Sequence, residues 1–176
     1  MGNENRFLGV AASVGFSKAA LLTGLTLECE PHLREYCNPE GCAKHGNNWV
    51  CPPGCGSLGE CAEKAALFNK GILLQSITGM DPDAPPEEYS KLSREHNLRL
   101  REFIETSGLR DMLALTTGGC IFCETCSYPE PCLKPDIRMN SLSAYGIDVG
   151  KLCGLAGWDY SFRPDMLYLT ALVMIG

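Results

Sequence analysis

Four cysteines in one short stretch are the feature of this sequence best suited to chemistry. The stretch GGCIFCETCSYPEPCLKP has the spacing C-x2-C-x2-C-x5-C and contains Cys120, Cys123, Cys126 and Cys132. Thiols at this spacing wrap a loop around one object, and backbone N–H groups of tight turns can point at the sulfides of an iron-sulfur cluster. Zinc sites more often set two C-x2-C pairs well apart in the sequence. The spacing therefore favours a 4Fe-4S cluster, with zinc and uncoordinated structural thiols as the alternatives.

A second, looser group of cysteines lies earlier in the chain, in CNPEGCAKHGNNWVCPPGCGSLGEC. It offers one more set of four ligands: Cys37, Cys42, Cys51 and Cys55. Its prolines and glycines predict a rigid loop, which runs into a helix whose positive N-terminus favours thiolate. Cys61, inside that helix, is either a packed apolar residue or a further ligand, and His45 is either solvated or a ligand.

The total number of cysteines bears on whether they form disulfides. The chain has 11 cysteines in 176 residues, and an odd number cannot all pair. No export signal is recognised near the N-terminus, so we expect a cytoplasmic, reducing environment in which thiols bind metal rather than form disulfides. Cys29 and Cys153 lie outside both groups and are expected to be packed thiols. Trp49 and Tyr128 neighbour the cysteines and are expected to keep water off the metal.

Charge and hydropathy limit the partners. The formal net charge is -6, and the Lys and Arg residues are scattered along the chain, so we expect no nucleic-acid partner. The apolar segments near the two termini are too short to cross a bilayer, so we expect no membrane insertion. An acidic surface suits docking onto basic patches of redox partner proteins.

The elements that would position the cysteines follow from periodicity and capping signals. Ser57 and Glu60 form a capping-box pattern that predicts a helix over about 58–70, and a longer helix follows DPDAPPEE and ends at Gly108. Short helices are predicted after Ser141 and Asp148. Apolar runs predict strands at about 18–23, 72–78, 111–117 and 166–175. The expected fold is α+β: a single domain over 1–176 with a small mixed sheet, flanking helices and two cysteine-rich loops.

Both cysteine motifs, the helical stretch between them and the hydrophobic final strand together resemble the DUF2284 family of predicted metal-binding proteins. The likeness extends from about GFSKA onward, and both motifs match in the order of their Cys, Pro and Gly residues. The resemblance implies metal binding through the cysteines of both motifs. It raises the weight of Cys61, because the family tends to have a cysteine at that position. It implies neither a reaction nor a substrate.

Three functions remain open at the level of sequence. The leading hypothesis is an iron-sulfur protein with two 4Fe-4S clusters that carries electrons for a larger enzyme system of anaerobic metabolism rather than acting as an enzyme alone. The second is a zinc-stabilised binding or regulatory module. The third is an accessory enzyme or cluster-transfer factor with one open metal site.

Overall fold

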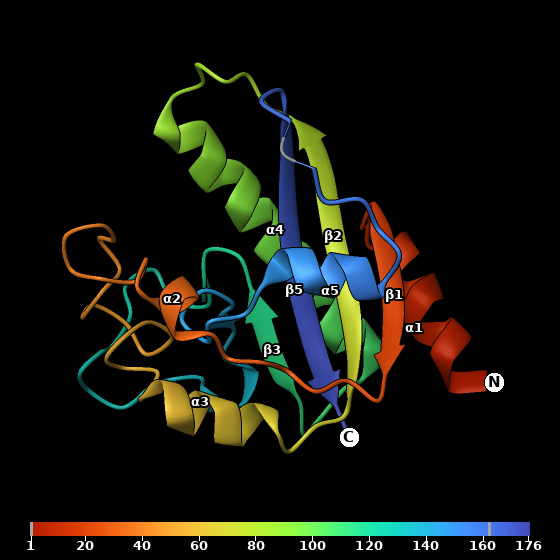
Figure 1. Ribbon diagram of the computed structural model, residues 1–176, viewed down its shortest axis with the longest axis horizontal. Helices are drawn as coiled ribbons and strands as arrows, with labels where there is room; N and C mark the ends of the chain where they lie inside the picture. Colours follow the sequence, from red (N-terminus) through yellow and green to blue (C-terminus); the bar gives the residue numbers. More distant parts are fainter. Residues whose placement is uncertain (1, 162) are drawn as a thin grey trace.

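A mixed β-sheet organises the fold. The computed structural model describes residues 2–161 and 163–176, and its strands in this part form one five-stranded sheet (Figure 1). The strands are β1 (Lys18–Thr23), β2 (Lys70–Gly79), β3 (Leu113–Thr116), β4 (Asn140–Ser141) and β5 (Met166–Ile175). Their order in the sheet is β1-β2-β5-β3-β4, with β3 and β4 parallel and the other neighbours antiparallel.

Alternating side chains of the central strands fill two separate cores. On β2, Leu73 faces one core while Ile72 and Leu74 face the other. The same alternation divides Leu172 from Val173 on β5. Successive residues of a strand point to opposite faces, so a sheet of this kind must be covered on both sides.

Helices cover both faces of the sheet. The core that contains Ile72 is closed by α1 (Gly2–Ser13) and by α4 (Pro86–Ser107), which lies behind the sheet in Figure 1. The core that contains Leu73 is closed by α3 (Leu58–Ala65) and by α5 (Val149–Leu155), which lies in front. Two short helical segments, α2 (Pro31–Arg34) and a 3-10 turn at Pro135–Ile137, contribute no buried side chains.

The cysteine-rich loops lie together at one side of the sheet. The second group of cysteines belongs to the connection between the parallel strands β3 and β4, at the end of the strand order. The loop between α2 and α3 carries the first group and lies next to that connection in Figure 1. A crossover between parallel strands must travel some distance to return to the sheet, and here its length is used for the cysteine loop.

The expected α+β class is confirmed, and so are most of the predicted elements. The capping box of Ser57 and Glu60 is present at the start of α3, and Gly108 ends α4 with φ 65°. Asp148 caps α5 by accepting a hydrogen bond from the backbone N–H of Lys151 at 3.0 Å. All four predicted strands are present as β1, β2, β3 and β5.

Some local predictions were wrong. The helix predicted over 58–70 ends at Ala65, because the chain must turn before Lys70 to enter β2. The helix predicted after Ser141 is replaced by strand β4 and a single turn, in which the N–H of Tyr145 donates to the carbonyl of Ser141 at 3.1 Å. Helices α1 and α2 and strand β4 were not predicted, since each is short or depends on contacts distant in sequence.

Candidate metal centre

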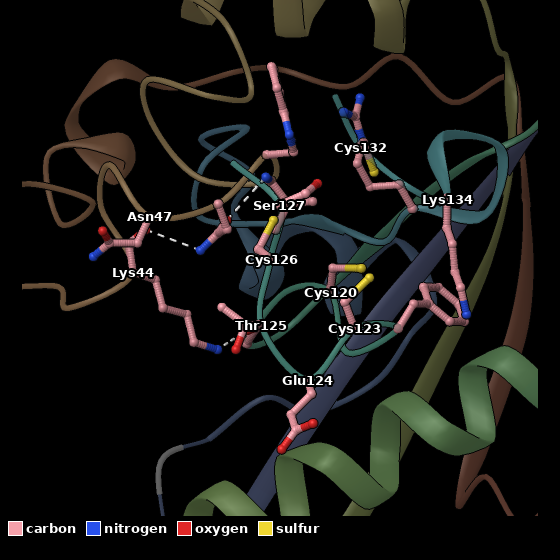
Figure 2. A pocket seen from close by; sticks show the side chains of 16 residues that line it. Lys44, Asn47, Cys120, Cys123, Glu124, Thr125, Cys126, Ser127, Cys132 and Lys134 are labelled. Carbon is pink, nitrogen blue, oxygen red and sulfur yellow. Dashed lines mark hydrogen bonds between the residues drawn. The ribbon is translucent and has the colours of Figure 1, made fainter. Parts of the chain in front are cut away.

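The four cysteines of the second group line one cavity. The cavity has a volume of about 290 Å³, and Cys120, Cys123, Cys126 and Cys132 all contribute to its wall. All four are half-buried free thiols. Figure 2 shows the sulfurs of Cys120 and Cys123 pointing in the same direction, with Cys126 and Cys132 at other parts of the lining. The four thiols that the spacing selected therefore line one cavity, but within the described residues no three of them stand close enough together to hold a metal ion.

Helix α4 fixes the start of this loop through one buried amide. The Nδ2 of Asn97 donates to the carbonyl oxygens of Thr117 and Gly119, each at 3.2 Å. Its Oδ1 accepts from the hydroxyl of Thr116 at 2.6 Å. The side-chain amide thus spans the junction between β3 and the cysteine loop and satisfies backbone carbonyls that would otherwise be buried without partners.

Two consecutive glycines allow this close approach. Gly118 and Gly119 have φ of 82° and 80°, a region that favours glycine. A Cβ on Gly118 would come within 2.5 Å of the Ser93 hydroxyl, and one on Gly119 within 3.1 Å of a Val50 methyl. The Gly-Gly pair before Cys120 is therefore required both by the turn and by the contact with α4 and the first loop.

The two cysteine loops are joined to each other. The ammonium of Lys44 in the first loop donates to the carbonyl of Gly118 in the second (Figure 2). The indole N–H of Trp49 donates to the carbonyl of Glu130 at 2.7 Å, and its ring packs edge-on against Tyr128 with centroids 5.0 Å apart. Trp49 also lines the cavity. These contacts make one assembly of two segments that are distant in sequence.

Backbone donors and cations surround the thiols of the second group. Among the described residues, no protein acceptor takes a hydrogen bond from the backbone N–H groups of residues 120–128. These donors remain available to water or to an anionic group held by the loop. Lys44, Lys134 and Arg138 line the cavity together with a single acidic residue, Glu124. The site therefore favours a negatively charged occupant.

The first group is divided between two environments. Burial raises the pKa of Cys51 to about 11, and the neighbouring thiols of Cys37 and Cys42 add to that rise. Cys55, in contrast, lies beside Cys61, and the Arg34 guanidinium donates to both sulfurs, at 3.6 and 3.5 Å. Of the predicted set of four, only Cys55 accepts a hydrogen bond from Arg34 among the described residues, and Cys51 is also near enough to contribute to the rise in its pKa.

The Cys55 and Cys61 thiols affect each other strongly. The hydrogen bond with Cys55, together with the Arg34 guanidinium, lowers the pKa of Cys61 against the opposing effect of burial. The same hydrogen bond and burial raise the pKa of Cys55. The Cys61 thiol also donates to the Cys55 carbonyl at 3.7 Å, so the two residues contact each other through side chain and backbone.

The remaining cysteines and His45 occupy different positions. Cys153 is fully buried on α5, where the Gln75 amide donates to its sulfur at 3.7 Å, so it packs as expected. Cys29 is half-buried, and the nearby thiol of Cys61 contributes, after burial, to the rise in its pKa. Its proximity to Cys61 was not predicted. His45 is half-buried in the first loop and is not among the residues that line the cavity.

Sequence reasoning missed Arg34 and Asn97. Neither belongs to a motif, and their roles appear only when α2 and α4 are placed against the loops. The one usable signal for Asn97 was its position on the apolar face of the predicted long helix, between His96 and Leu100. A polar residue on such a face indicates a buried hydrogen-bonding partner.

The donor chemistry of the site fits a thiolate-bound metal. Eleven free thiols gather mainly at the joined loops, and soft thiolate ligands select zinc or iron-sulfur clusters. As the side chains stand, no group of three Cys, His, Asp or Glu residues within 2–161 and 163–176 is arranged closely enough to hold a metal ion. The same part of the chain contains no helix long and apolar enough to cross a membrane.

Fold and site together define a cysteine-rich α+β protein with a thiol-lined cavity between two joined loops. The chain belongs to the DUF2284 family of predicted metal-binding proteins, whose profile matches residues 21–175. The resemblance seen in the cysteine motifs is therefore confirmed. Searches of curated proteins and of solved structures gave no match.

Proposed function

We propose that this protein binds two 4Fe-4S clusters and relays single electrons between larger protein partners. The observation that carries the proposal is the single cavity lined by all four cysteines of the second group. Cys120, Cys123, Cys126 and Cys132 would hold one cluster there. Cys37, Cys42, Cys51 and Cys55 would supply the thiolates for the other.

The surroundings of the cavity support a cluster over a lone zinc ion. A thiolate-bound cluster carries negative charge on its sulfides as well as on its ligands, and backbone N–H groups stabilise it. The loop segment from 120 to 128 offers N–H groups without protein acceptors, and three cationic side chains line the cavity. A zinc tetrahedron of thiolates has no sulfides for such donors to reach.

Electron transfer is the activity that this ligand set serves best. When bound, a cluster with four thiolate ligands supplies a one-electron redox couple and has no iron position left open for a substrate. The chain's own contribution is to hold the thiols, limit water through Trp49 and Tyr128, and set the local charge through Lys44, Lys134 and Arg138.

Metal analysis of anaerobically purified protein tests the cluster content. We expect about eight irons and about eight acid-labile sulfides per chain. The variants Cys123→Ala and Cys42→Ala should each lose about half of both, because one cluster depends on each group. Two equivalents of zinc without sulfide would overturn the iron-sulfur assignment.

Reversible reduction tests the electron-transfer role. A strong one-electron reductant should bleach the visible absorption and produce a paramagnetic signal, and reoxidation should restore the original spectrum. Zinc has no accessible second oxidation state, so a zinc protein would show neither change. A coloured protein that no reductant alters would contradict electron transfer even if iron were bound.

A further inference from the structure

Arg34 occupies an unusual position for a cationic side chain. It belongs to α2, a four-residue helix with no buried side chains. The segment before α2 is attached to the rest of the fold by the backbone of Glu30, whose N–H donates to the carbonyl of Gly146 at 2.8 Å. A Cβ on Gly146 would lie 2.5 Å from the Glu30 carbonyl oxygen, so this docking leaves no space for a side chain. The attachment directs Arg34 into the protein.

The guanidinium reaches two sulfurs and two carbonyl oxygens. Nη1 donates to the Cys61 sulfur at 3.5 Å and to the carbonyl of Ala144 at 2.9 Å. Nη2 donates to the Cys55 sulfur at 3.6 Å and to the carbonyl of Gly56. Both cysteines are almost completely excluded from solvent, with exposures of 3% for Cys55 and 0% for Cys61.

This half-buried charge has no acidic counter-ion. Over residues 2–161 and 163–176, no carboxylate lies within salt-bridge distance of Arg34, and the nearby Glu30 pairs with Lys151 and His32 instead. A guanidinium stays charged, and a charge removed from water needs a compensating partner. Arg34 instead contacts two backbone carbonyls and the sulfurs of Cys55 and Cys61, and a metal-bound thiolate is the anionic group that these sulfurs could supply.

We propose that Cys61 is a metal-binding thiolate of the first centre, beside Cys55, and that Arg34 is the positioning residue that balances the charge of both sulfurs. The ligand class is a thiophilic metal, either the iron of a cluster or zinc. The inference rests on the proposed function and changes the ligand set of its first centre. A four-thiolate centre that includes Cys61 leaves one of Cys37, Cys42, Cys51 and Cys55 unbound.

Cys153 shows what a packed cysteine looks like in the same protein. It is equally buried and also lies on a helix, but its sulfur receives a hydrogen bond from the neutral amide of Gln75. No second thiol and no guanidinium accompany that contact among the residues described. Comparing the two cysteines separates ligation from packing, because the Cys→Ala change removes the same atom from an equally buried position.

The experiment compares the metal content of anaerobically purified wild type, Cys61→Ala and Cys153→Ala, with circular dichroism as a check on folding. We expect Cys61→Ala to lose about half of the bound iron and sulfide, and Cys153→Ala to retain all of it. Retention of wild-type metal by Cys61→Ala would overturn the proposal. Should Cys61→Ala fail to fold, the more conservative Cys61→Ser replaces it with the same two outcomes.

The two proposals fail in different ways. If wild type holds zinc and no sulfide, and Cys61→Ala loses one zinc, the iron-sulfur function is wrong and the ligand role of Cys61 stands. If only the Cys123 variant loses iron and the Cys61 variant does not, the iron-sulfur function stands and the ligand role of Cys61 is wrong.

A second readout concerns Arg34 and does not depend on activity. For an iron-sulfur centre, removing a positive charge and two N–H donors from the sulfurs should shift the reduction potential to more negative values. We expect Arg34→Gln to show this shift for one centre only, with iron content near that of wild type, and Arg34→Lys to show less of it. Unchanged potentials in Arg34→Gln would overturn the role of Arg34.

Discussion

His96 is a titratable side chain buried at the centre of α4, on the face of the sheet away from α3 and α5. It is fully excluded from solvent, and its Nδ1 lies 2.9 Å from the Ser76 hydroxyl. Burial, followed by the positive charge of Arg99, lowers the pKa of His96 to about 4. The fold therefore holds this imidazole neutral at a pH where the unfolded chain takes up a proton.

This difference makes stability depend on pH in a defined direction. In the unfolded chain the pKa of a histidine is ~6.5, so below that pH the unfolded state binds a proton. In the native state the pKa of His96 is about 4, so the native state does not bind this proton until the pH falls to about that value. We expect the free energy of unfolding to fall by about 1 kcal/mol between about pH 7 and about pH 5.5 from this residue. Anaerobic denaturant titrations at several pH values measure it.

His96→Gln is the matched control for that measurement. Glutamine offers a neutral polar side chain of similar reach and does not titrate, so the contribution of His96 should disappear from the pH profile. Equal pH slopes in the two proteins would show that His96 does not carry the effect.

At the scale of elements, α4 determines where β3 ends and where the second cysteine loop begins. The Asn97 amide makes hydrogen bonds with three groups at that junction: the hydroxyl of Thr116 and the carbonyls of Thr117 and Gly119. Replacing it with alanine leaves the buried Gly119 carbonyl without a donor, removes one donor from the half-buried Thr117 carbonyl and leaves the Thr116 hydroxyl without its acceptor, at a cost of about 1–3 kcal/mol per buried group left unsatisfied.

We expect Asn97→Ala to lower the free energy of unfolding by about 2–4 kcal/mol and to make metal at the second group easier to remove. Denaturant titration and the rate of metal loss to a chelator measure the two effects. Thr116→Val removes only the hydroxyl that donates to Asn97 and should have the smaller effect on both. Wild-type chelation kinetics in Asn97→Ala would contradict the positioning role of α4.

At the scale of the whole molecule, the Trp49 contact joins two loops that no strand or helix connects directly. Its hydrogen bond to Glu130 and its edge-on packing with Tyr128 hold the first loop against the second. One hydrogen bond and one aromatic pair are each worth about 0.5–1.5 kcal/mol. Trp49 also lines the cavity, so the same contact limits access of water to the thiols.

Trp49→Leu should therefore accelerate the loss of metal from the second group several-fold, while lowering the free energy of unfolding by only about 1–2 kcal/mol. Chelator kinetics followed by absorption measure the rate. Trp158 is the natural comparison, since it packs against the core on the α5 side, with Lys18 over its ring. Equal acceleration in Trp158→Leu would mean that general destabilisation, and not the loop contact, controls the metal.

The sequence by itself determined the features that depend on neighbours along the chain. The α3 capping box, the glycine that ends α4 and the alternating strands β2 and β5 are local patterns, and all were predicted. The spacing of the second cysteine group is local too, because three of its thiols are separated by single turns. That is why the sequence alone selected the four residues that line one cavity.

The tertiary structure alone decided which distant groups meet the thiols. Arg34 reaches Cys55 and Cys61 because α2 docks on Gly146, and Asn97 reaches Gly119 because α4 packs behind β3. Hydrophobic periodicity does not predict contacts of this kind, because they join residues that are far apart in the sequence. The environment of Cys61 follows from the same cause: its position on an apolar helix face suggested packing, and the fold places the Arg34 guanidinium 3.5 Å from its sulfur.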